Sequence, residues 1–165
     1  MASIKALYIP ADLDAEVELL EFEAGDLSFM QKKVGGYIQP ADGDDDHPLS
    51  IWIDEDGKSR GREINRRATL LLYASNPAFI DRDILVGDAL VTGLPDDVEG
   101  DTQSAPQELL DLVLNTSEYR IEVQAPGPDW SSNQVRYESY WEALSAAYNL
   151  STRWLLVTAW RASAA

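Results

Sequence analysis

The chain has 165 residues, of which 45% are apolar, and its 29 acidic and 13 basic residues give a net charge of −16 at pH 7. It has no cysteine and one histidine, His47, which excludes disulfides, thiolate metal sites and a cysteine nucleophile. The negative charge argues against direct binding of nucleic acid or of an anionic membrane, because the long-range field repels phosphates.

The N-terminal half alternates strand patterns with turn residues. In chain order the sequence predicts strands at residues 4–10 and 16–23, a helix at 26–34, a strand beginning at 37 and a strand at 49–53. Asp26 is the expected N-cap of the helix, and Gly35-Gly36 is its expected C-cap. The alternation slips at Leu19-Leu20, which predicts a bulge in the second strand, and the exposed face of that strand would be a row of carboxylates.

The turn at residues 54–57 is followed by an ambiguous region. Gly57 is expected to take a positive φ, and residues from Lys58 onward are expected to return as the partner strand of a hairpin. Residues 65–73 fit two structures, because Asn65 can cap a helical turn while the run ATLLLY can form a buried strand. Periodicity does not distinguish the two for an apolar run this short.

In the C-terminal half the sequence predicts two helices and three strands. In chain order these elements and their connections are a strand at residues 84–92, a loop or linker at 95–105, a helix at 106–115, a strand at 119–123, a turn at 125–130, a helix at 131–150 and a strand at 153–160. Ser131 or Ser132 is the expected N-cap of the longer helix.

These elements predict an α+β fold, a mainly antiparallel sheet with a few helices packed on one face. The length fits one domain, or one core with an added subdomain. We expect residues 1–94 to form one domain and residues 95–105 to form a linker or exposed loop. Residues 106–165 would then be a C-terminal α-β-α-β extension, either separate or part of the same core.

The acidic loop DGDDDH is the strongest candidate for a metal site. Its aspartates at 42, 44 and 46 match the first three ligand positions of a calcium loop, but His47 replaces the required glycine and Ile53 replaces the bidentate glutamate. A histidine beside three aspartates tends to hold its proton and is poorly suited as a general base. Phosphate-binding glycine motifs are also absent. We therefore expect no catalytic residue, no metal and no cofactor, and a protein that is not an enzyme.

Residues 58–69 (KSRGREINRRAT), here called the basic segment, contain five of the thirteen basic residues. One interpretation is a binding site for a nucleotide-like anion, because guanidinium groups offer paired donors to phosphate or carboxylate. Its ligand-binding residues would be Gly35, Gly36, Tyr37, Asn65, Arg66, Arg67 and Thr69. The other interpretation is a local counterweight, whose arginines pair with neighbouring carboxylates. Since Arg67 and Thr69 immediately precede the run LLLY, part of the segment is expected to enter the core.

Aromatic residues gather near the C-terminal end of the sequence. Four of them lie in the helix predicted at 131–150: Tyr137, Tyr140, Trp141 and Tyr148. Core packing explains them, and so does a partner-binding patch, because tryptophan and tyrosine dominate binding hot spots. In the second case the expected partner-binding residues, which suit a basic partner surface, are Glu16, Glu18, Glu138, Trp141 and Glu142.

Four sequence blocks occur in order: IKALYIPAD, VGGYI, DEDGK…NRRAT and LVGDALVTG. With these blocks, residues 4–94 resemble a family of domains of unknown function that is common in bacteriophages and mobile elements of bacteria, especially phages of actinobacteria. Gln39 stands where that family commonly has an acid, and Asp88 makes the last block more polar. The resemblance implies a small phage accessory protein that modifies the host, and it supplies no catalytic residue.

Together these observations favour a non-enzymatic, acidic, phage-encoded protein that binds and modulates a host protein with a basic surface. In its most concrete form it is an inhibitor that mimics DNA. The alternative is a small-ligand module that sequesters a nucleotide-like host signal. The first residues, MASIKALYIPADLD, lack a signal-peptide pattern, and no apolar stretch has the length of a membrane helix. We therefore expect location in the host cytoplasm, with no membrane partner and no direct nucleic-acid partner, and the oligomeric state stays open.

Overall fold

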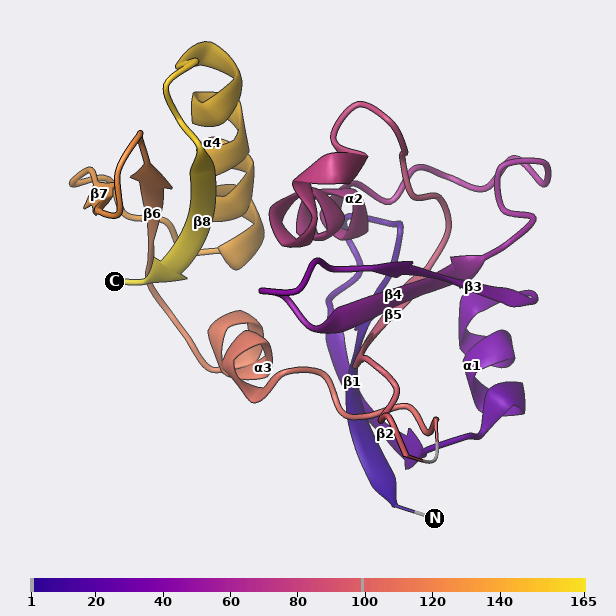
Figure 1. The fold of residues 1–165 in the computed structure, drawn as a ribbon. Helices are drawn as coiled ribbons and strands as arrows, with labels where there is room; N and C mark the ends of the chain where they lie inside the picture. The colour runs from indigo at the N-terminus through magenta and orange to yellow at the C-terminus, as the bar shows by residue number, and fades with distance from the viewer. Residues whose placement is uncertain (1, 99) are drawn as a thin grey trace. The chain divides into compact units, whose positions relative to one another are not determined.

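The fold was examined in a computed structural model, which describes residues 2–98 and 100–165. Contacts within the chain divide it into two compact units, one up to Gln107 and one from Glu108 (Figure 1). Each unit has an antiparallel sheet and at least one helix that packs on it. The α+β fold predicted from the sequence is therefore confirmed.

The first unit is built on a five-stranded antiparallel sheet. In spatial order its strands are β2 (Glu18–Glu23), β1 (Ser3–Ile9), β5 (Ala89–Gly93), β4 (Leu49–Asp54) and β3 (Ile38–Asp42). The edge strands are therefore β2 and β3. The register between β1 and β2 runs without interruption from Ser3↔Glu23 to Tyr8↔Glu18, so the bulge predicted at Leu19-Leu20 does not form. An edge strand tolerates Leu19 at 44% exposure because single apolar residues are common on protein surfaces.

Helix α1 (Leu27–Val34) follows β2 directly and is capped as predicted. The Asp26 side chain accepts a hydrogen bond from the N–H of Phe29. At the other end Gly35 has a left-handed φ of 88°, and its N–H donates to the carbonyl of Gln31. The local cap signals in the sequence are therefore sufficient to set both ends of this helix.

The helices α1 and α2 (Arg66–Ser75) cover opposite faces of this sheet (Figure 1). The α1 face contains one buried cluster, formed by Ile4, Ala6, Phe22, Ala24, Met30, Val34 and Leu90. Side chains alternate along a strand, so the fully buried Leu7, Ile51 and Val91 point to the other face. The expectation of helices on one face is corrected here, because the central strands are apolar on both sides and need two covers.

The ambiguous residues 65–73 are helical. Asn65 is the N-cap of α2, and its side chain accepts a hydrogen bond from the N–H of Ala68. Ala68, Leu71 and Leu72 are buried at helical spacing, which gives α2 an apolar face toward the sheet. A short 3₁₀ helix, η1 (Pro77–Phe79), follows.

The hairpin predicted after β4 does not form. Because β4 already has β3 and β5 as its two neighbours, residues 58–63 have no free strand edge to pair with and turn away instead. Gly57 does not have a positive φ, and Gly61 takes that role with a φ of 69°. The segment ends at an isolated bridge between Ile64 and Val86, which lies outside the named strands.

The end of the segment predicted as a linker is tied to the first unit. The carbonyl of Gln103 accepts a hydrogen bond from the N–H of Gly93, and the N–H of Ala105 donates to the carbonyl of Lys5. Ala105 is 3% exposed. Residues 103–105 therefore continue the pairing of β1 beyond the end of β5.

The second unit is a three-stranded antiparallel sheet with one long helix against it. In spatial order the strands are β7 (Trp130–Ser132), β6 (Tyr119–Gln124) and β8 (Ala159–Ala164), and α4 (Tyr140–Arg153) packs on β6 and β8. Helix α3 (Gln107–Leu114) precedes β6. The buried residues of this unit include Ile121 and Val123 on β6 and Ala143, Leu144 and Ala147 on α4.

The long helix begins later than predicted. Its N-cap is Ser139, which accepts from the N–H groups of Trp141 and Glu142, whereas Ser131 and its neighbours pair with β6 as β7. Ser139 and Glu142 have the spacing of a capping box, as do Ser131 and Gln134, but the pairing of Ser131 with β6 excludes the earlier start. The helix also runs on to Arg153, so the strand predicted at 153–160 starts only at Ala159.

Candidate functional site

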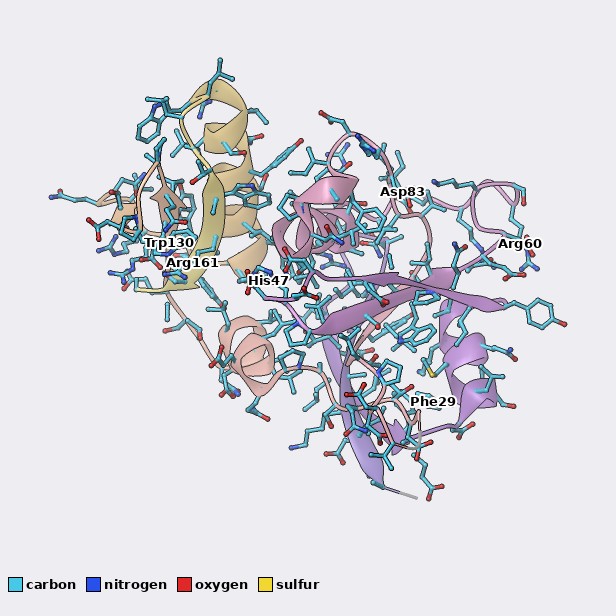
Figure 2. All side chains as sticks on the ribbon, viewed as in Figure 1. Phe29, His47, Arg60, Asp83, Trp130 and Arg161 are labelled. Atoms are coloured by element: carbon cyan, nitrogen blue, oxygen red, sulfur yellow. The ribbon has the colours of Figure 1, made fainter. Side chains whose placement is uncertain are left out.

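The first half of the basic segment is bound to Asp54, the last residue of β4. The Asp54 side chain is fully buried, and its Oδ2 lies 3.2 Å from Nε of Arg62 and 3.5 Å from Nη1 of Arg60. Both guanidinium groups also donate to the carbonyl of Gly35, at 2.7 Å from Arg62 and 3.2 Å from Arg60. These arginines, of which Arg60 is labelled in Figure 2, therefore neutralise a buried carboxylate and the negative end of α1.

The glycines proposed as ligand contacts lie against the same carboxylate. A Cβ atom on Gly36 would lie 2.6 Å from Oδ1 of Asp54, and one on Gly35 would lie 3.0 Å from Nη2 of Arg62. Glycine is therefore required at position 36 by close packing. The next residue, Tyr37, points its side chain away from the core and is 65% exposed.

Asn65 and Thr69, from the second half of the basic segment, are used inside the fold. Asn65 is fully buried, and its Nδ2 donates to the carbonyls of Ile9 at 2.8 Å and Gly87 at 2.9 Å. Thr69 Oγ1 donates to the carbonyl of Asn65 at 2.7 Å and accepts from the N–H of Leu85. These side chains hold the end of β1 and the segment before β5 against α2.

Arg67 is a buried cation with carbonyl partners. It is 8% exposed, and its Nη2 donates to the carbonyls of Pro10 at 2.8 Å and Asp12 at 3.0 Å. Burial lowers the pKa of Arg67, partly offset by the charge of Asp12. Its Nε has no hydrogen-bond partner in the described chain. Arg66, the adjacent residue, is exposed.

Asp88 ties the start of β5 to β1. Its carboxylate accepts from Tyr8 Oη and from the N–H of Ala11, both at 2.9 Å. Burial, followed by the hydrogen bond to Asp88, raises the pKa of Tyr8 to about 12. Asp88, which makes the block LVGDALVTG more polar, thus binds residues of the block IKALYIPAD.

The acidic loop after β3 folds on itself. Asp44 Oδ1 lies 2.7 Å from Nδ1 of His47, and the N–H of Asp44 donates to the carbonyl of Ser75. Within the described residues no group of three or more acidic or histidine side chains could hold a metal ion.

A run of exposed acidic residues lies on β2 and its flanking turns, here called the acidic edge. Between Lys5 and Lys32 there is no basic residue, and seven residues are acidic: Asp12, Asp14, Glu16, Glu18, Glu21, Glu23 and Asp26. All seven are exposed. In the described chain only Glu21 has a cation within ion-pair distance, the Lys5 Nζ at 3.9 Å.

The other proposed partner-binding residues lie at the start of α4. Glu138 and Glu142 are exposed, and Trp141 is half-buried. The Trp141 ring packs edge-on against Tyr140, with 5.0 Å between ring centroids. Glu142 lies in the first turn of α4, where the helix dipole favours a negative charge.

The face of the second sheet opposite α4 has a small ion-pair network that the sequence did not indicate. Arg161 lies over the Trp130 ring, 3.8 Å from its centroid (Figure 2), and its Nε donates to Glu122 at 3.1 Å. Burial alone would raise the pKa of Glu122, but hydrogen bonds from Ser163 and Arg161, together with the charges of Arg161 and Arg120, outweigh it, and the pKa lies below its usual value. Only the register, which sets Glu122 opposite Arg161, reveals this network.

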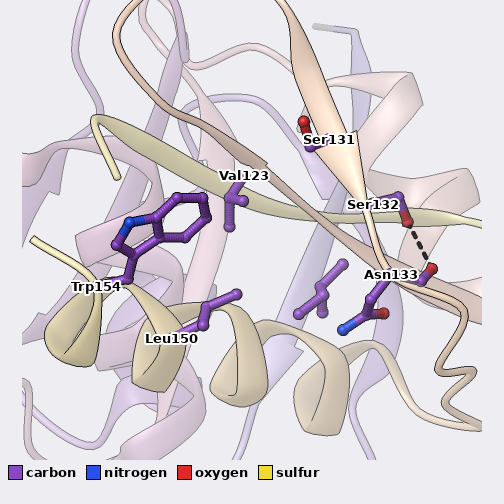
Figure 3. A pocket seen from close by; sticks show the side chains of 7 residues that line it. Val123, Ser131, Ser132, Asn133, Leu150 and Trp154 are labelled. Atoms are coloured by element: carbon purple, nitrogen blue, oxygen red, sulfur yellow. Dashed lines mark hydrogen bonds between the residues drawn. The ribbon is translucent and has the colours of Figure 1, made fainter. Parts of the chain in front are cut away.

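Shallow pockets also lie elsewhere in the described residues. One of about 180 Å³ in the second unit is lined by Ile121, Val123, Ser131, Ser132, Asn133, Leu150 and Trp154 (Figure 3). Leu155, next to its tryptophan, is 91% exposed. Another of about 430 Å³ in the first unit is lined by Lys58, Tyr73, Asp81, Arg82, Asp83 and Ile84, and Lys58 pairs there with Asp83. Neither pocket includes a residue of the proposed anion site.

A family comparison accounts for most of the chain. The family model described as a domain of unknown function, DUF3846, matches residues 4–118. The chain belongs to this family. The DUF3846 match runs beyond residue 94, where the sequence resemblance was expected to end, and includes all of α3.

No curated protein matches the chain, and no solved structure matches it. In the described residues no helix has the length and apolar content needed to cross a membrane.

Proposed function

We propose that the protein is a non-enzymatic binding protein whose acidic edge binds the basic surface of a partner protein. The observation that carries the proposal is the set of seven exposed carboxylates, of which one has an ion-pair partner in the described chain. Like charges held close together repel one another and destabilise the folded state. A cationic partner relieves that repulsion, so the unbalanced charge favours such a partner.

Protection against aggregation is the competing explanation for charge on an edge strand. It accounts for Glu21 and Glu23, which lie on β2 itself. It does not account for Asp12, Asp14 and Glu16, which precede the strand. The charge extends beyond what edge protection requires, and this favours a binding role.

The experiment compares two variants with the same net charge. One, the neutralised-edge variant, replaces Glu16, Glu18, Glu21 and Glu23 by Gln. The matched control neutralises four exposed acids outside the acidic edge, Asp45, Asp46, Glu55 and Asp97. Wild type and both variants are immobilised and used to capture proteins from host lysate at low and at physiological salt.

We expect a partner that wild type and the control capture and that the neutralised-edge variant loses. Four exposed charge pairs at about 0.3–0.5 kcal/mol each weaken binding about tenfold or more. The binding should also weaken as salt rises, because the Debye length falls to about 8 Å at physiological ionic strength. Capture of no specific protein at either salt, or equal loss in both variants, contradicts the proposal.

We further propose that the protein is phage-encoded, acts in the host cytoplasm and inhibits a host factor that binds nucleic acid. The support is the sequence resemblance to phage-borne domains together with the DNA-like sign of the acidic edge. In this version duplex DNA competes with the protein for the captured partner. If DNA does not compete, the protein is not a DNA mimic, and the proposal that it binds a basic protein surface still stands.

A nucleotide-like anion remains the alternative ligand. The observation in its favour is the buried guanidinium of Arg67, whose Nε lacks a hydrogen-bond partner. Against it, the polar groups of Asn65 and Thr69 already have partners within the fold. A melting-temperature screen with nucleotides tests this alternative, and an unchanged melting temperature at high ligand concentration removes it.

A further inference from the structure

The outer edge of β2 presents unpaired backbone groups. In the β1–β2 ladder, alternate residues of each strand bond to the neighbour while the others point outward. Lys5 turns its N–H and carbonyl toward Ser104 and Ala105, on the side of β1 away from β2. The alternate β1 residues therefore bond to Glu18, Leu20 and Phe22.

The backbone groups of Leu19, Glu21 and Glu23 consequently face away from the sheet. In the described chain no hydrogen bond is formed by the N–H groups of these residues, and the only acceptor in use is the Glu23 carbonyl, which bonds to Asp26 in the following turn. The same three residues are exposed. The edge is thus open over most of the length of β2.

Strand β2 lacks most of the features that prevent an edge strand from pairing with another chain. The strand contains no proline, lysine or glycine, its register has no bulge, and β2 is six residues long. Negative charge is the remaining protection. It repels a second acidic copy of this chain, but it does not repel a basic segment.

We infer that the acidic edge accepts an added β-strand from a partner, an extended segment that alternates basic and apolar side chains. The inference rests on the proposed function and specifies how the basic partner binds. Residues directly opposite each other on neighbouring strands share a face. Basic side chains of the partner would meet Glu21 and Glu23 on one face, while its alternate residues meet the half-buried Leu20 on the face covered by α1.

The alternation follows from the two faces of β2. Leu20 and Phe22 belong to the α1 side, where Phe22 stacks on Phe29 with ring centroids 4.6 Å apart. A charged side chain placed against these rings would lose hydration without gaining a partner. The recognition is therefore strand addition, in which backbone hydrogen bonds provide affinity and alternate side chains provide selectivity.

A peptide that alternates lysine with valine over the length of β2 is the probe. The control peptide has the same sequence and charge, but its backbone nitrogens are methylated, so it lacks the backbone donors that would pair with β2. We expect the lysine-valine peptide to bind about tenfold or more tightly than the control, because several backbone hydrogen bonds depend on those donors. Titration calorimetry or fluorescence anisotropy measures both affinities.

Two further measurements locate the peptide. Amide hydrogen exchange should show new protection at Leu19, Glu21 and Glu23 when the lysine-valine peptide binds, while Leu20 and Phe22 are already protected. The variant Leu19→Pro should abolish binding without altering the charge, because it removes an outward donor from an edge position that tolerates proline. If Leu19→Pro does not fold, as judged by circular dichroism, the exchange pattern of the wild type decides.

The outcomes separate this inference from the proposed function. Equal binding of the two peptides that is lost in the neutralised-edge variant refutes strand addition and leaves the electrostatic proposal standing. Lysine-valine binding that survives in the neutralised-edge variant refutes both. Binding of neither peptide refutes strand addition, while lysate capture decides the proposed function. Protection of Leu19, Glu21 and Glu23 without any peptide, in a protein that sediments as a dimer, makes a second copy the occupant and overturns the inference.

Discussion

Replacement of Asn65 by Ala distinguishes a structural role of the basic segment from a ligand-binding role. Asn65 is fully buried and forms three hydrogen bonds, to the carbonyls of Ile9 and Gly87 and from the N–H of Ala68. Alanine removes the N-cap of α2, at a cost of about 1 kcal/mol. It also removes the side-chain donor from two buried carbonyls, at a cost of about 1–2 kcal/mol each.

The expected loss is therefore about 3–5 kcal/mol of unfolding free energy, a large part of the stability of a small domain. At a urea m-value of about 2 kcal/mol/M the midpoint falls by about 2 M. Urea unfolding followed by circular dichroism measures the shift. The neighbouring Arg66→Ala is the matched control, because Arg66 is exposed and its loss should change stability by less than about 0.5 kcal/mol.

A loss below about 1 kcal/mol for Asn65→Ala would refute this reasoning. A gain in stability would favour the ligand site instead, since binding residues are commonly held at the expense of stability. Asn65→Asp separates the two contributions. It keeps the cap oxygen but replaces the donor by a buried carboxylate facing two carbonyls, so it should be more damaging than alanine.

Three further outcomes follow from the same contacts. Arg62→Ala should destabilise the protein by about 1–2 kcal/mol, because it removes the closer partner of the fully buried Asp54. Arg60→Ala should cost less, and equal urea midpoints for the two variants would contradict this. Tyr8 has its pKa raised from 10 to about 12 by burial and by Asp88, so the stability it contributes is full below pH 10 and is lost as the pH rises towards 12. The difference in unfolding free energy between wild type and Tyr8→Phe should shrink over that interval, and a constant difference would count against it. The neutralised-edge variant should sediment as larger species than the control variant of equal charge, since its open strand loses the charge that repels a second copy. Identical sedimentation would show that the acidic edge does not prevent self-association.

Local signals in the sequence were sufficient for several elements. The caps of α1, Asp26 and Gly35, act on neighbouring N–H and carbonyl groups, and both were predicted correctly. The same physics placed the start of α4 wrongly, because Ser131 with Gln134 and Ser139 with Glu142 both have the spacing of a capping box. A cap signal is decisive when it is unique within its segment.

The partners of the basic segment could not be predicted in the same way. Arg60, Arg62 and Asp54 were all visible in the sequence, yet their pairing depends on β4 being central, so that the following residues turn back over α1. Arg67 was expected to enter the core. Its carbonyl partners, in residues 10–12, lie far away in sequence and meet it only because β1 runs beside β5.

The sequence by itself determined the class of the fold, the absence of cysteine chemistry and the concentration of negative charge in residues 12–26. Composition can be read directly from the sequence, and strand alternation and helix caps depend only on residues a few positions apart. Only the tertiary structure decided that this charge lies on an open strand edge, that two helices cover opposite faces of one sheet, and that Arg60, Arg62 and Arg67 have partners within the fold. Those properties depend on the order of strands in space, which no local pattern encodes.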